Sequence, residues 1–138
     1  MVRFPSPEWL AAYREAINAS EEFRVAGAEW EGDVSYGIEA EPMKDVMSDA
    51  WGWFDLHHGK CRDAKPVTQE EGERAAYVIR APYSTWKDVI IGRLDPIKGM
   101  TQGRLRLSGD LHAIRDNVAA VGCLVSLARS IPTEFPDE

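Results

Sequence analysis

Apolar residues near the start of the chain recur every three or four positions. Trp9, Tyr13 and Ile17 share one face of a helix at this spacing. The preceding Ser6-Pro7-Glu8 supplies a serine N-cap, a proline at the first helical position and an acidic residue in the first turn. The pattern therefore predicts a helix over residues 7–23.

Further along, apolar residues alternate with polar or small ones, which is the two-residue period of a strand. Over residues 29–40, one face carries Trp30, Val34, Tyr36 and Ile38, with a kink expected at Gly32. Strand patterns also cover residues 51–58, 75–81 and 104–109. A short helix or a loop is predicted for residues 43–50. Residues 60–72 are polar and contain Pro66, so they are predicted to form a turn or loop.

Two more helices are predicted in the last third of the chain. Ser84 or Thr85 is placed to cap the first, and Asp95-Pro96 breaks it and starts a further helical turn. The last helix, residues 111–130, is apolar nearly all round from Val118 onward, so it is either buried or covers something apolar. Strands grouped between helices, rather than alternating with them, predict an α+β fold with helices on one face of a sheet.

Charge and length exclude several classes of function. The chain has 138 residues, the size of a single domain, and a net charge of −7. Binding to DNA or RNA needs a concentrated basic surface, so no nucleic-acid partner is expected. The same charge disfavours docking on anionic lipid headgroups but leaves transient apolar contact with a membrane open. The longest nearly uncharged stretch, residues 118–128, is too short to span a bilayer.

The cysteine count and the two ends of the chain bear on its location. Two cysteines do not make a disulfide framework, which favours a reducing compartment. The N-terminus lacks the apolar run of a signal peptide. The C-terminus reads FPDE and lacks a Ser-Lys-Leu peroxisomal address. We therefore expect a cytoplasmic protein.

Residues 84–96 read STWKDVIIGRLDP and residues 103–111 read GRLRLSGDL. These two runs resemble the sterol carrier protein family. In that family a helix, an Asp-Pro or similar break, and a short strand ending in Gly-Asp precede a C-terminal helix. Trp9-Leu10 and the run WEGD at residues 30–33 look like a prokaryotic branch of the family. The resemblance covers most of the chain as one domain, residues 1–138, and is weakest over residues 43–73.

The resemblance implies a five-stranded, mainly antiparallel sheet with helices packed on one face and an apolar cavity between them. Such a cavity would hold a fatty acyl chain, a sterol-like molecule or an isoprenoid, with no cofactor and no catalysis. The last helix or residues 95–103 would act as its gate. Twelve residues are predicted to line the cavity, although they could equally fill a dry core: Trp86, Val89, Ile90, Leu94, Ile97, Met100, Leu105, Leu107, Val118, Val121, Leu124 and Val125. The alternative is an accessory or dimerisation module that packs its apolar C-terminal helix on a partner or a second copy.

Other groups with reactive side chains do not form a recognisable site in the sequence. Asp55, His57, His58 and Cys61 are metal-capable residues at short spacing, but strand alternation points His58 away from Asp55 and His57. We therefore expect no metal there. Cys123 lies in the most apolar helix, where burial makes a thiol inert. No nucleophile, base and orienting group come together, so the sequence predicts no enzyme.

Overall fold

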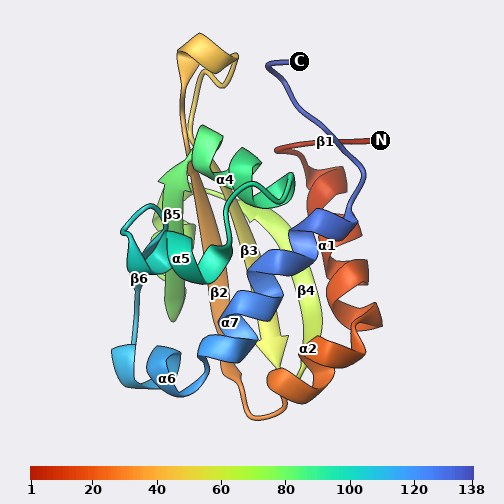
Figure 1. The fold of residues 1–138 in the computed structure, drawn as a ribbon, viewed down its shortest axis with the longest axis vertical. Coiled ribbons are helices and arrows are strands. Elements are labelled where there is room, and N and C mark those ends of the chain that lie inside the picture. Colours follow the sequence, from red (N-terminus) through yellow and green to blue (C-terminus); the bar gives the residue numbers. More distant parts are fainter.

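The computed structural model describes residues 1–138 (Figure 1). The strands are β1 (Val2–Arg3), β2 (Glu31–Glu39), β3 (Ala50–His57), β4 (Lys60–Val67), β5 (Tyr77–Pro82), β6 (Arg106–Ser108) and β7 (Thr133–Glu134). The α-helices are α1 (Pro7–Ala19), α2 (Glu21–Ala26), α3 (Gln69–Glu73), α4 (Tyr83–Ile90), α5 (Pro96–Thr101), α6 (Leu111–Asp116) and α7 (Val118–Ser126). Two 3-10 turns, η1 (Pro42–Lys44) and η2 (Leu127–Ser130), complete the elements.

Five strands form one sheet in the order β4-β3-β2-β5-β6. All neighbours run antiparallel except β2 and β5, which are parallel. Helices α1, α2, α4, α5 and α7 lie over one face, as Figure 1 shows. The short strands β1 and β7 pair in parallel and bring the two ends of the chain together. The predicted α+β fold class is therefore confirmed.

The central strand β2 is buried on both faces, but different groups cover the two faces. Val34, Tyr36 and Ile38 are buried toward the helices. The opposite face carries small residues: Gly37 lies under the ring of Trp51, where a Cβ would come within 2.7 Å of that ring. Ser35 donates a 2.6 Å hydrogen bond to the carbonyl of Gly72, which seats the short helix α3 on this opposite face.

The helix predicted over residues 7–23 is in fact two helices. Helix α1 ends at Ala19, and the hydroxyl of Ser20 accepts a 3.0 Å hydrogen bond from the Phe23 N–H to cap α2. Serine is one of the strongest N-cap residues, so it ends one helix and starts the next. The chain turns there, and α2 contacts α7.

The prediction of a turn or loop over residues 60–72 was wrong. Its first part is strand β4, which lies at the edge of the sheet and pairs only with β3. Proline is tolerated in an edge strand because its missing N–H need not join a ladder. The second part is α3, where Thr68 and Glu71 form a reciprocal capping box.

The ends of two later helices also differ from the prediction. Helix α4 begins at Tyr83, and neither Ser84 nor Thr85 caps it; the Ser84 N–H instead donates to the distant Glu41 carboxylate at 2.6 Å. The last helix is interrupted at Asn117, whose φ of −126° separates α6 from α7. Asp110 caps α6 and Asp95 caps α5. No helix here combines the length and the apolar character that crossing a membrane requires.

A buried pair of tyrosines joins α1, α7 and the central strand β2. Tyr13 of α1 donates to the carbonyl of Leu124 in α7, and its oxygen lies 2.7 Å from the Tyr36 hydroxyl of β2. Because the single Tyr13 proton is directed to Leu124, Tyr36 donates to Tyr13. Both side chains are almost fully buried. Burial raises the pKa of both hydroxyls, so they remain protonated donors.

Replacing Tyr13 with phenylalanine should destabilise the fold more than the same change at Tyr36. Tyr13→Phe removes both hydrogen bonds and should cost about 1–3 kcal/mol, whereas Tyr36→Phe leaves the bond to Leu124 and should cost about 1 kcal/mol. Urea denaturation of the two variants and the parent protein measures the difference. If Tyr36→Phe lowered the free energy of unfolding as much as Tyr13→Phe or more, this assignment of donors would be wrong.

Candidate functional site

An apolar crevice lies between α7 and the end of the sheet formed by β2, β5 and β6. Its inner part has a volume of about 20 Å³. Twelve of its thirteen lining residues are hydrophobic, and Ser108 is the exception. The sheet and α2 supply one wall: Phe23, Trp30, Val34, Leu56, Tyr77, Val78, Ile79 and Leu107. Helices α6 and α7 supply the other: Ile114, Ala120, Val121 and Leu124.

An open groove at the surface adjoins the inner crevice. The groove measures about 270 Å³ and lies between α5, β6, α6 and α7. Leu107, Ile114 and Val121 line both the groove and the inner crevice. These three side chains therefore stand between solvent and the interior, and we call the two parts together the α7 crevice.

Helix α6 is the most weakly attached wall of the α7 crevice. None of its residues is buried, and Leu111 is 64% exposed. Ile114 is its one side chain that lines the crevice. Asp110 caps the start of α6 and Asn117 separates it from α7. A short helix with so little buried surface costs little to displace.

The twelve residues predicted to line a cavity divide into two equal groups. The first group lines the α7 crevice: Ile97, Met100, Leu107, Val118, Val121 and Leu124. The second group is packed in the core: Trp86, Val89, Ile90, Leu94, Leu105 and Val125. The stripe on α4 belongs to the second group because α4 packs on β2, β5 and α7.

Of the sheet side of the crevice, the sequence predicts only Leu107. Trp30 and Val34 share the apolar face of their predicted strand, but nothing in the local pattern shows that β5 lies beside that strand and β6 beyond β5. Phe23 reaches the crevice because the helix break at Ser20 redirects α2. Ile114 lay in the predicted last helix and carried no signal of its own.

A second apolar hollow lies at the other end of the sheet. It measures about 270 Å³ and is walled by the N-terminal segment, α1, and strands β2 to β4. Its lining includes Phe4, Trp9, Leu10, Ile38 and Trp86. Tyr36 lines this N-terminal hollow while Leu124 lines the α7 crevice, so the hydrogen-bonded tyrosines stand between the two spaces.

The polar residues that the sequence placed close together are separated in the structure. Asp55 forms a bidentate ion pair with Arg62, with both contacts at 3.1 Å. Cys61 is buried, and its thiol donates to the carbonyl of Asp63. Neither residue approaches the imidazoles as a metal ligand.

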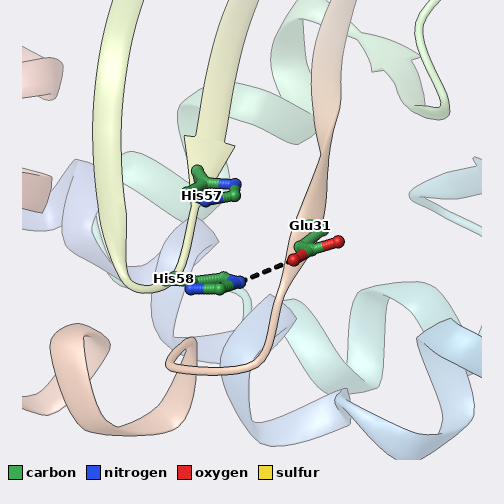
Figure 2. A group of neighbouring side chains, drawn as sticks. All are labelled: Glu31, His57 and His58. Carbon is green, nitrogen blue, oxygen red and sulfur yellow. Dashed lines mark hydrogen bonds and ion pairs between the residues drawn. The ribbon is translucent and has the colours of Figure 1, made fainter.

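The two histidines lie together, contrary to the prediction of opposite directions. Strand β3 ends at His57, and His58 occupies the following turn with a φ of 49°, so strand alternation does not extend to it. Their rings stack with centroids 4.0 Å apart, and Glu31 of β2 lies beside both (Figure 2).

Comparison with known proteins identifies the family. The model of the SCP-2 sterol transfer family matches residues 36–121, which is more than half of the chain. The chain belongs to this family. A crystal structure of sterol carrier protein 2 is similar, with a TM-score of 0.82 and 35% identity over 91% of this chain and 97% of that chain.

Other relatives span a wide range of sequence identity. A conserved hypothetical protein of Thermus thermophilus has a TM-score of 0.79 and 34% identity over 94% of this chain and 90% of that one. Sterol carrier protein 2 of Yarrowia lipolytica shares the fold at 10% identity, with a TM-score of 0.58 over 88% of this chain and 90% of that one. No protein with a curated description matches the chain significantly.

The part of the chain shared with the SCP-2 family contains most of the α7 crevice. Strand β5, strand β6, helix α6 and the start of α7 all fall within residues 36–121. The N-terminal hollow is walled in part by residues 4–10 and Ala128, which lie outside that match. The α7 crevice is therefore the better candidate for a feature that the family shares.

Neither cysteine is expected to react as a nucleophile. Burial raises the pKa of the Cys61 thiol to about 11 and also raises the pKa of Cys123. The Cys61 thiol should therefore be almost fully protonated at pH 8, and thiol–disulfide reagents should label Cys61 in the native chain at least tenfold more slowly than in the urea-unfolded chain. Labelling of Cys61 in native protein at the unfolded rate would contradict its buried position.

Proposed function

We propose that this protein binds and carries a lipid or another hydrophobic molecule in the α7 crevice without catalysing a reaction. The observation that carries the proposal is the almost wholly apolar lining of a crevice that opens to the surface, in a chain of the SCP-2 sterol transfer family. Ligand sites of this kind are lined mainly by hydrophobic side chains with few polar groups. Sterols, fatty acyl chains and isoprenoids are the candidate ligands.

Binding would require the crevice to open. The inner part has a volume of about 20 Å³, which is close to the space that one water molecule needs, so a preformed cavity of lipid size is not present there. Each methylene group that leaves water contributes about 0.8 kcal/mol, and an acyl chain of several methylenes would offset the cost of moving a short helix. Helix α6 is the wall best suited to act as this gate, rather than residues 95–103 or the whole last helix.

The alternative of a dimerisation module finds less support in the packing of α7. Its large side chains Val121, Leu124 and Val125 are buried. The surface that it leaves exposed carries one large apolar side chain, Val118 at 39% exposure, beside small residues such as Ala119 and the partly exposed Cys123. A helix that docked on a partner would present large apolar side chains outward.

Filling the crevice should abolish ligand uptake. Leu107 is half-buried and lines both parts of the crevice, so Leu107→Trp should place an indole in the path of a ligand. We expect at least tenfold weaker binding of fluorescent fatty acids and loss of co-purifying lipid in native mass spectrometry. Leu105 is a poorer site because it is 1% exposed and packed against Gly99, where a larger side chain would disturb the core.

The matched control is Val25→Trp on α2, a position that is 66% exposed and lines neither space. It should bind ligand as the parent protein does. Equal binding by Leu107→Trp, in protein that keeps its circular dichroism spectrum, would place the ligand elsewhere. Loss of binding on filling the N-terminal hollow instead would assign the function to that hollow.

Weakening the lid should accelerate ligand exchange. Ile114→Ala removes the side chain that holds α6 over the crevice and should raise the ligand dissociation rate about threefold to tenfold. Leu111→Ala, on the same helix but outside the crevice, should leave the rate unchanged. Stopped-flow displacement of a bound fluorescent fatty acid measures both rates, and identical rates would remove α6 as the gate.

A further inference from the structure

A carboxylate and two imidazoles converge at one end of the sheet. The β2–β3 register places Glu31 directly opposite His57, and His58 follows in the turn between β3 and β4. Glu31 Oε1 lies 2.7 Å from His58 Nε2. The ligand atoms of all three residues lie within 4.8 Å of one another, and Figure 2 shows Glu31 beside the stacked rings.

The backbone under these side chains is held in place. Gly59 has a φ of 81° and lies against α2, where a Cβ would come within 2.6 Å of the Arg24 carbonyl oxygen. The His58 N–H donates a 2.9 Å hydrogen bond to the carbonyl of Trp30, the residue before Glu31. The turn is thereby fixed to the start of β2, so the three side chains need only rotate to change their spacing.

His58 adopts a positive φ, which few residues other than glycine adopt. Both central residues of this two-residue hairpin turn, His58 and Gly59, have positive φ. Such turns favour asparagine, aspartate or glycine at the first position. Asparagine is therefore a substitution at position 58 that keeps the turn conformation.

We propose that Glu31, His57 and His58 form a binding site for a divalent transition metal such as Zn²⁺. Two imidazole nitrogens and one carboxylate oxygen form a donor set that zinc accepts with a fourth position open to water. Bond lengths of about 2.0–2.1 Å in a tetrahedral site separate ligand atoms by roughly 3.4 Å. The observed separations, from 2.7 Å to at most 4.8 Å, span that value, and the His58 and Glu31 side chains are more than half exposed and free to adjust.

Neighbouring carboxylates are already engaged and would not complete the site. Asp55 pairs with Arg62, and Asp33 accepts hydrogen bonds from Trp53 and from the Ala76 N–H. Glu31 alone is directed at the imidazoles.

Zinc titration of the full chain by isothermal calorimetry tests the site. The background variant Cys123→Ser excludes binding through the partly exposed thiol. We expect one Zn²⁺ per chain, with an affinity that falls as the pH is lowered because protons compete for the imidazole nitrogens. Co²⁺ should give visible absorption bands that report imidazole and carboxylate coordination.

His58→Asn is the decisive variant because asparagine suits the positive φ and should leave the fold intact. It should weaken zinc binding at least tenfold, as should Glu31→Gln, while His112→Asn on α6 should change nothing. No calorimetric binding by the parent chain, or unchanged binding in His58→Asn, would overturn the proposal. Fatty-acid uptake should be the same in His58→Asn as in the parent protein. A failure of the zinc proposal would therefore leave the lipid proposal unaffected, and the reverse also holds.

Discussion

The hydrogen bonds of Tyr13 hold the helical layer at a fixed place over the sheet. The Tyr13 hydroxyl connects α1 to the backbone of α7 and accepts a hydrogen bond from Tyr36 on the central strand. Because the two hydroxyls and the Leu124 carbonyl are buried together, the loss of one leaves another without a hydrogen-bond partner in an apolar interior. Helices α1 and α7 are thus fixed to β2 at this point, and the empty spaces lie to either side of it.

The α7 crevice is a consequence of helices that are too short to cover the sheet. The break at Asn117 divides the last helical segment, so α7 packs firmly while α6 contributes a single side chain, Ile114, to the crevice wall. A continuous helix would bury its length against β5 and β6 and close the space. The same break therefore gives the fold both an apolar interior surface and a wall that costs little to move.

Local patterns in the sequence were enough to predict the class of fold and most elements. The alternation in β2 and the Asp95-Pro96 break depend only on local backbone conformation. They could therefore be predicted without knowing which segments pack together. Strand β4 was missed because the tolerance of an edge for Pro66 depends on where the strand lies in the sheet. The sheet wall of the crevice and the Glu31–histidine cluster both depend on which strands become neighbours, and no single segment encodes that.

Backbone amide chemical-shift mapping during titration with a fatty acid tests the central claim most directly. The account predicts saturable shifts concentrated at Leu107, Ile114 and Val121, with broadening through α6 as the lid opens. Shifts confined to Phe4–Leu10 and Val67 would move the ligand to the N-terminal hollow. A spectrum that does not change at saturating fatty acid would contradict a carrier that works through the α7 crevice.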